Sequence, residues 1–169
     1  MENPKQALRE NLQGQRPRSS AGLTLQLQQL VRKLAPSTIA SYQPLSAEPD
    51  VSEFNRWAEK QYQLVYPRVI GDDLVFAQGP VAPGRYGIQE PAGNEVAAID
   101  LVLVPALAAD RLGNRLGKGR GFYDRFLVGF SGPAYAVVFD EEVLASIPVE
   151  SHDRKVSGVI TPNRTIVFD

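Results

Sequence analysis

Apolar residues recur every three or four positions in three segments of the first third of the chain, which is the spacing of an amphipathic helix. We expect the second of these helices to end before Pro36, because the residue that precedes a proline avoids the α region. In the third, Phe54, Trp57 and Tyr62 recur at helical spacing, and we expect this face to pack on a sheet. The predicted helices begin near Pro4 and cover Leu23–Leu34 and Val51–Tyr62.

Short apolar runs of β type alternate with helical segments in the rest of the chain. Leu64–Val69 and Leu74–Ala77 are separated by a Gly-Asp-Asp turn, which predicts a hairpin. Ile99–Val104 is almost continuously apolar, as expected of a central strand that is buried on both faces. Further strands are predicted at Thr38–Tyr42, Ala134–Phe139, Val159–Thr161 and Thr165–Phe168, with helices at Phe122–Phe130 and from about Asp140. This alternation predicts a three-layer α/β/α fold with a mostly parallel sheet.

Two segments show neither the helical spacing nor the apolar run of a strand. Gly79–Gly93 is rich in glycine and proline and is expected to be an irregular loop that crosses the surface. Pro105–Leu116 is expected to be a long connection after the central strand. Ligands of parallel α/β sheets collect beyond the carboxyl ends of the strands, so the sequence that follows Ile99–Val104 is the expected place for a site.

Composition narrows the class of protein. A chain of 169 residues with 43% hydrophobic and 22% charged residues is expected to form one globular domain over residues 1–169. Its net charge of -1 provides no global attraction to nucleic acid or to an anionic membrane. The chain has no cysteine, which excludes disulfides and thiolate metal sites. His152 is the only histidine, so carboxylates are the natural metal ligands and Mg2+ is favoured over zinc.

The N-terminal residues lack the apolar core of a secretory signal, and no segment has the roughly 18 consecutive apolar residues that span a bilayer. We therefore expect a cytoplasmic protein that acts on small molecules, without a nucleic-acid or membrane partner, and we expect a monomer.

Residues 113–124 join closely spaced glycines to dense positive charge. Glycine lets peptide N–H groups approach an anion, and Arg115, Lys118 and Arg120 add charge that a polyphosphate would neutralise. The spacing fits neither a Walker loop, which needs four residues before Gly-Lys, nor a dinucleotide fingerprint, because Gly117, Gly119 and Gly121 form GxGxG. The segment therefore predicts a phosphate-binding loop, and the alternative is a solvated basic loop.

Ordered motifs along nearly the whole chain resemble the 5-formyltetrahydrofolate cyclo-ligase family. The glycine segment is the most specific of them. The full set is Lys5-x-x-Leu8-Arg9, Glu48-Pro49-Asp50, Pro67-Arg68, Gly87-Ile88-Gln89-Glu90-Pro91, Ile99 to Pro105, Asp110 to Asp124, Pro148-x-Glu150-x-His152-Asp153 and Val159-Ile160-Thr161. The resemblance implies a fold like that of the ribose-5-phosphate isomerase and CoA-transferase group. It also implies conversion of 5-formyltetrahydrofolate to 5,10-methenyltetrahydrofolate, with ATP as co-substrate and Mg2+ as metal.

The resemblance also implies roles for single residues. Lys5 and Arg9 correspond to an N-terminal ATP-binding pair, and Asp124 and Asp153 to the magnesium ligands. Catalytic roles fall on Arg115, Lys118, Arg120 and Tyr123. The ATP loop comprises Arg115, Leu116, Gly117, Lys118, Gly119, Arg120, Gly121, Phe122 and Tyr123, and the folate contacts comprise Glu48, Tyr86, Lys118, Arg120 and Phe122.

Each assignment has an ordinary structural alternative. Lys5 and Arg9 can form a solvated helix face, although two cations four positions apart favour a phosphate between them. Asp124 can interact with a helix dipole, Asp153 can be a turn residue, and Glu48 can be a solvated loop acid. Asp110 can support Arg115 or the metal, or cap a loop, and we expect His152 to be a surface neighbour of Asp153. Ala109, Val69 and Phe122 depart from the family pattern, and the connection over residues 16–22 is short and irregular against it.

Two other functions remain open from the sequence. A non-catalytic folate- or nucleotide-binding module would keep the fold without turnover, but it would not need the whole phosphoryl-transfer set. A sugar-phosphate or CoA enzyme of the same fold has no motif in its favour.

Overall fold

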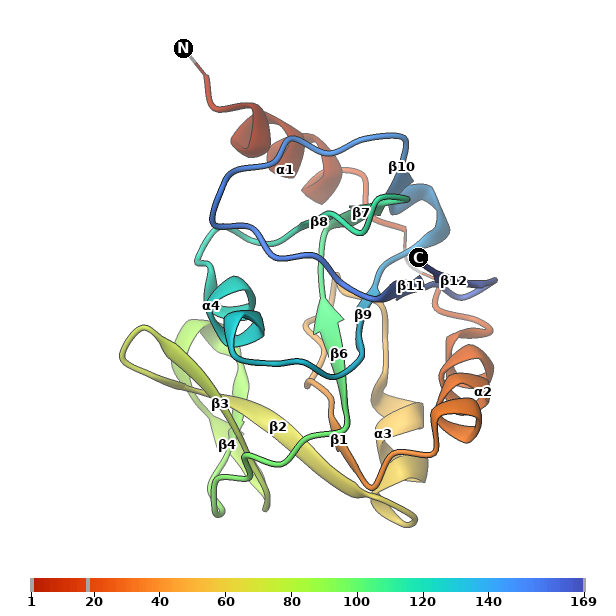
Figure 1. The fold of residues 1–169 in the computed structure, drawn as a ribbon, viewed down its shortest axis with the longest axis vertical. Helices are drawn as coiled ribbons and strands as arrows, with labels where there is room; N and C mark the ends of the chain where they lie inside the picture. The colour runs from red at the N-terminus through yellow and green to blue at the C-terminus, as the bar shows by residue number, and fades with distance from the viewer. Residues whose placement is uncertain (1, 18, 169) are drawn as a thin grey trace.

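A seven-stranded sheet forms the centre of the computed structural model, which describes residues 2–17 and 19–168 (Figure 1). The inner pairs β1–β2, β1–β6, β6–β9 and β9–β11 are parallel, whereas β2–β3 and β11–β12 are antiparallel. The strand order is β12 (Thr165–Val167), β11 (Gly158–Ile160), β9 (Ala134–Val137), β6 (Leu101–Pro105), β1 (Thr38–Ala40), β2 (Gln63–Ile70) and β3 (Asp73–Ala77). The predicted mostly parallel sheet and the β2–β3 hairpin are confirmed.

The sheet is covered on both faces by helices. On one face, α2 (Leu23–Leu34) and α3 (Ser52–Glu59) contribute Leu27 and Phe54 to a core with the β6 residue Leu103. On the other face, α4 (Phe122–Val128) packs Leu127 against Val102 and Val104 of the same strand. The apolar run of β6 is therefore explained by burial on both sides.

The first helix, α1 (Pro4–Gln13), lies apart from the other helices, at one end of the molecule (Figure 1). Its N-cap residue is Asn3, whose side chain accepts hydrogen bonds from the backbone N–H groups of Lys5 and Gln6. Leu8 and Leu12 pack against a small cluster that contains Leu107, Leu116 and Ile147. The helix therefore rests on the segment that follows β6.

That segment is not the plain connection expected over residues 105–116. It contains β7 (Ala108–Asp110) and β8 (Arg115–Leu116), which form a three-stranded sheet with β10 (Val143–Leu144). The expectation was wrong because these strands are too short to show a period, and the pairing of β7 with β10 joins positions far apart in the sequence. Asp110 stabilises the turn by accepting hydrogen bonds from Leu112, Asn114 and Ile147. It is the loop cap.

The segment 79–93 is also more regular than expected. β4 (Val81–Pro83) and β5 (Gln89–Pro91) pair as an antiparallel hairpin around a single 3-10 turn, η1 (Arg85–Gly87). Side chains tie it to β2: Arg68 Nη1 donates to the carbonyls of Pro91 and Gly93, and Glu90 Oε2 accepts from Val69 N–H. These contacts form only in the folded chain, so local composition indicated a loop.

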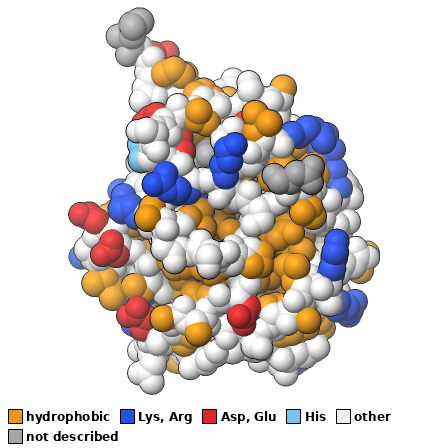
Figure 2. Space-filling model, viewed as in Figure 1, with side chains coloured by type: hydrophobic (Ala, Val, Ile, Leu, Met, Phe, Trp, Pro, Cys, Tyr) orange, Lys and Arg blue, Asp and Glu red, His pale blue; other side chains and the backbone are white. Residues whose placement is uncertain are grey.

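The structure confirms other predicted elements, although some of them end at different residues or have a different helical type. The third helix ends at Glu59 rather than Tyr62, and the short helix near Asp140 is a 3-10 turn, η2 (Asp140–Glu142). No helix within the described residues has the length and apolarity needed to cross a membrane. Asp and Glu side chains are interspersed with Lys and Arg on the face drawn in Figure 2, so charge of one sign does not cover it.

Candidate active site

A cavity of about 560 Å³ lies beside the glycine segment. It is bordered by α1, by the loop that follows β1, by the β4–β5 hairpin and by the first residues of α4. Every residue for which the sequence predicted a site role lines it: Lys5, Arg9, Glu48, Tyr86, Asp153 and all residues from Arg115 to Asp124. Elements that are distant in the sequence thus meet at one hollow.

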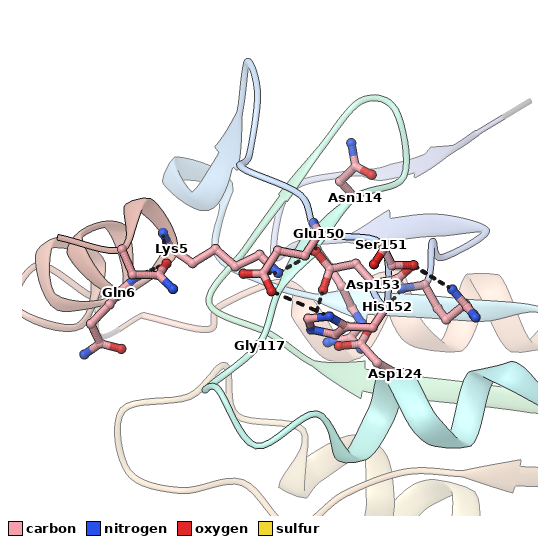
Figure 3. Close-up of polar contacts among 12 residues, drawn as sticks. Lys5, Gln6, Asn114, Gly117, Asp124, Glu150, Ser151, His152 and Asp153 are labelled. Atoms are coloured by element: carbon pink, nitrogen blue, oxygen red, sulfur yellow. Dashed lines mark hydrogen bonds and ion pairs between the residues drawn. The ribbon is translucent and has the colours of Figure 1, made fainter. Parts of the chain in front are cut away.

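Lys5 is buried although its side chain is cationic, and it pairs with acids from the C-terminal part of the chain. Its Nζ lies 2.5 Å from Asp153 Oδ2 and 3.6 Å from Glu150 Oε1. Figure 3 shows Lys5 extending from α1 toward these two residues. A buried charge needs such a partner, because its desolvation is otherwise uncompensated.

Arg9 lies one helical turn further on and contacts the glycine segment. Its Nε donates to the Gly117 carbonyl at 2.8 Å. Gly119 has a φ of 103°, a conformation that favours glycine, and it lies against the Arg9 guanidinium. Lys5 and Arg9 therefore have separate protein partners, which reduces the repulsion that their spacing implied.

Arg115 lies on β8 and pairs with the first turn of α4. Its Nη2 lies 2.7 Å from Asp124 Oδ1. Burial lowers the pKa of Arg115, and the charge of Asp124 opposes this effect. Within the described residues, the buried Nε has no hydrogen-bond partner. One strong donor of this cavity-lining residue is therefore left without a protein partner.

Tyr123 contributes a second polar atom that is buried without a hydrogen-bond partner. Its hydroxyl oxygen is buried and has no hydrogen-bond partner within the described part of the chain. Burial raises the pKa of Tyr123, the charge of Glu48 raises it further, and Arg115 opposes both. The phenol is therefore neutral near pH 7 and keeps its O–H as a hydrogen-bond donor.

Asp124, His152 and Asp153 form a group that can hold a metal ion. Each residue offers one ligand atom, and these atoms lie within 4.8 Å of one another. Figure 3 shows His152 beside both carboxylates. Burial raises the pKa of Asp153, but the hydrogen bonds from Lys5 and from Glu150 N–H outweigh it, so the pKa is lowered. Asp153 is therefore ionised near pH 7, as a metal ligand must be.

His152 is a mostly exposed neighbour of Asp153, as expected from the sequence. Its Nε2 lies 3.5 Å from Asp153 Oδ1, and its Nδ1 lies 3.5 Å from Glu150 Oε2. The sequence did not indicate that its ring would also lie near Asp124, because that proximity depends on α4 packing beside residues 150–153.

Glu48 is buried at the opposite side of the cavity. Its Oε1 accepts the Leu45 backbone N–H at 2.8 Å and lies 3.6 Å from Lys118 Nζ. Glu48 is therefore not the solvated loop acid of the alternative interpretation. The ion pair joins the glycine segment to the loop that follows β1, across the hollow.

Tyr86 lies in η1 with a φ of 60°, a left-handed conformation that is uncommon for a residue other than glycine. The Arg120 guanidinium carbon lies 3.6 Å from the centroid of its ring, and the Phe122 ring centroid lies 5.8 Å away. The tip of the hairpin is thereby joined to the glycine segment by stacked side chains.

Several cavity residues were not assigned a site role from the sequence. Tyr42 was treated as the end of a strand, and Glu90 only as part of a motif. Arg125 lines the cavity through its position on α4, one turn beyond Gly121. The position of Tyr42 at the carboxyl end of a predicted strand is the sequence signal that could have placed it at the cavity.

Comparison with known proteins agrees with this geometry. The model of the 5-formyltetrahydrofolate cyclo-ligase family matches residues 2–162. A 5-formyltetrahydrofolate cyclo-ligase of Mycolicibacterium smegmatis is 35% identical over 152 residues, which cover 80% of this chain and 78% of that protein.

Solved structures give the same result. A 5,10-methenyltetrahydrofolate synthetase from Aquifex aeolicus superposes with a TM-score of 0.84 at 25% identity, covering 98% of this chain and 93% of that one. A synthetase of the same name from Mycoplasma pneumoniae gives a TM-score of 0.75 at 25% identity, with coverages of 95% and 99%. The match extends over almost the whole chain in sequence and in structure, and the protein belongs to the 5-formyltetrahydrofolate cyclo-ligase family.

Proposed function

We propose that this enzyme converts 5-formyltetrahydrofolate to 5,10-methenyltetrahydrofolate, with ATP as the phosphoryl donor and Mg2+ as the metal. Family membership favours an enzyme over a non-catalytic binding module. The observation that carries the ATP assignment is the convergence of six cations, Lys5, Arg9, Arg115, Lys118, Arg120 and Arg125, on the lining of one cavity.

The triphosphate would occupy the side of the cavity near α1. Arg9 and Arg115 flank the backbone of Gly117, and Lys5 lines the cavity while its Nζ pairs with Asp153. Arg115 lines the cavity, and its guanidinium adds positive charge for the phosphate oxygens. Cations and backbone N–H groups placed around transferring phosphate oxygens are the usual means of stabilising phosphoryl transfer.

The residues present fit a magnesium ion. Asp124 and Asp153 offer carboxylate oxygens, which Mg2+ prefers. The hydrogen bonds made to Asp124 by described residues reach only its Oδ1, so Oδ2 is available as a ligand. When bound, Mg2+ would neutralise charge on the phosphates. Arg115 and Lys5 orient the two carboxylates through their ion pairs.

The folate would occupy the side near the β4–β5 hairpin. Glu48 can accept hydrogen bonds from the N–H groups of a pterin, and Tyr86 and Phe122 offer aromatic faces for stacking. Leu74 and Val69 add apolar surface to the same wall. This division places the reacting ends of the two substrates near Lys118, Arg120 and Tyr123, between the two sides of the cavity.

The chemistry follows from the weak leaving ability of a formamide oxygen. That oxygen attacks the γ-phosphorus of ATP, the bond between the γ-phosphorus and its bridging oxygen breaks, and ADP leaves. N10 of the folate then attacks the formyl carbon and loses its proton, and the C–O bond breaks to release phosphate. The protein's part is to align the oxygen with the phosphorus, spread the charge of the moving group and exclude water.

A spectrophotometric assay tests the proposal. The purified protein is incubated with 5-formyltetrahydrofolate, ATP and Mg2+, and formation of the methenyl product is followed by absorbance, with each component omitted in turn. Product should form only in the complete mixture. No product in any mixture would overturn the proposed function, and product without ATP or Mg2+ would overturn the corresponding co-substrate or metal.

A further inference from the structure

Arg16 makes a buried set of contacts just beyond the end of α1, outside the cavity. Its Nε and Nη2 lie 2.9 and 3.0 Å from the two carboxylate oxygens of Glu142, and Nη2 also donates to the Ala106 carbonyl at 3.0 Å. The guanidinium carbon lies 5.5 Å from the centroid of the Phe139 ring. Both charged side chains are almost fully buried, at 5% and 3% exposure.

These partners belong to the carboxyl ends of two central strands. Ala106 follows β6, and Phe139 and Glu142 follow β9. Glu142 is itself oriented, because its Oε1 accepts the Phe139 backbone N–H at 3.0 Å. Arg16 therefore joins the chain that leaves α1 to the segments that follow two central strands, through a bidentate ion pair.

The helix has few other attachments. Lys5 is its only buried residue, and Leu8 and Leu12 are partly buried against the small cluster beside β8. Because a helix moves as a stiff unit, displacement of its C-terminal end would move Arg9 and Lys5 together, away from Gly117 and Asp153. None of Arg16, Ala106, Phe139 and Glu142 lines the cavity.

We propose that Arg16, paired with Glu142, is a positioning residue that sets the placement of α1 and thereby the affinity of the enzyme for ATP. The proposal rests on the proposed function, because it takes Lys5 and Arg9 to face the triphosphate. The hydrogen bonds of Arg16 and Glu142 with described residues do not reach the hairpin or the loop after β1, which form the folate side of the cavity. Substitution of Arg16 should therefore raise the KM for ATP and leave the KM for 5-formyltetrahydrofolate nearly unchanged.

The test compares Arg16→Met with Arg32→Met, a control on α2 whose guanidinium carbon lies 5.6 Å from the Trp57 ring centroid, outside the cavity lining. Arg16→Met should raise the KM for ATP about tenfold while the KM for 5-formyltetrahydrofolate stays within about twofold. Hydrogen exchange of amides 4–13 should become faster. Arg16→Lys, which keeps the charge but not the fork, should recover part of the ATP affinity.

Arg16→Met leaves the Glu142 charge buried and unpaired, which can unfold the chain. The double variant Arg16→Met with Glu142→Gln removes both charges, and the Gln carbonyl can still accept the Phe139 N–H. It should show the same selective rise in the KM for ATP. A folded double variant with wild-type KM values and wild-type exchange of α1, or with reduced kcat and both KM values unchanged, would overturn the positioning role.

Failure of the proposed function has a different outcome. In that case wild type forms no ATP-dependent product, whatever residue 16 is. If wild type turns over and Arg9→Ala raises the KM for ATP, while the folded Arg16 variants match wild type, only the inference about Arg16 is wrong.

Discussion

Lys5 Nζ lies 2.5 Å from Asp153 Oδ2, which joins residues 148 positions apart in the chain. The pair places a cation of the first helix against a carboxylate of the proposed metal site. It also makes Asp153 sensitive to Lys5, because the hydrogen bond from Lys5 lowers the pKa of the carboxyl group. Position and ionisation of Asp153 therefore depend on the docking of α1.

This pair predicts a pH dependence of stability. The pKa of folded Asp153 is lowered from its ordinary value of 3.8, so the ionised group stabilises the fold above that pH, and the contribution is lost as pH falls through the lowered pKa. In Lys5→Met this part of the pH dependence should be smaller. Urea unfolding of both proteins between about pH 3 and 6 measures it. A difference in unfolding free energy that does not change with pH would contradict the prediction.

Tyr123→Phe should lower kcat/KM without lowering the free energy of unfolding. The hydroxyl is buried without a described partner, so its removal should leave the free energy of unfolding unchanged or raise it by up to about 1 kcal/mol. If the hydroxyl binds substrate, kcat/KM should fall about tenfold. Denaturation midpoints and steady-state kinetics measure the two effects.

Tyr42→Phe is the matched control for stability, because the Tyr42 hydroxyl donates to the Pro49 carbonyl at 3.2 Å. The free energy of unfolding of Tyr42→Phe should be about 1 kcal/mol lower than that of the wild type. Equal losses of stability in the two variants would mean that Tyr123 has a protein partner after all.

Asp124→Asn should abolish metal-dependent turnover. The fold should be retained at a lower free energy of unfolding, because the Asn carbonyl oxygen can still accept from Arg115 and Arg154 although the charge partner of the buried Arg115 is lost. The carboxylate is proposed as a magnesium ligand, and an amide is a weaker ligand without charge. Rates measured over a range of Mg2+ concentrations test this. Asp73→Asn, an exposed change at the start of β3, is the control and should have the wild-type Mg2+ dependence. An unchanged rate of Asp124→Asn at limiting Mg2+ would remove its metal role.

Tyr86→Gly should weaken folate binding without loss of stability. Glycine accepts the φ of 60° at this position without strain, so the change removes the ring that stacks on Arg120 and leaves the backbone favoured. The KM for 5-formyltetrahydrofolate should rise about fivefold, corresponding to about 1 kcal/mol of stacking. Tyr86→Phe keeps the ring and should retain the wild-type value. Equal KM values for Tyr86→Gly and wild type would show that the ring does not contact the substrate.

Much of the fold could be predicted because its signals are local. The apolar run of β6 and the helical period of α2 reflect burial that repeats every few residues. The β7–β8–β10 sheet and the β4–β5 hairpin were missed because their strands have two or three residues, and their order depends on partners such as Arg68 and Asp110. The position beyond the carboxyl end of a parallel strand indicated only the glycine segment. Lys5, Glu48 and Asp153 were indicated by motifs that resemble the family, and the structure places them at the same cavity.

The amino-acid sequence by itself determined the α/β class and the mostly parallel sheet, because residue type and period govern burial. Its motifs, through their resemblance to the family, also indicated residues that gather at one cavity. Only the tertiary structure decided which charges meet. The pairing of Lys5 with Asp153, of Arg16 with Glu142 and of Glu48 with Lys118 arises from packing of α1 and the loops onto the sheet. Such contacts join distant segments, so no local pattern specifies them, and their strength depends on the burial that the complete fold creates.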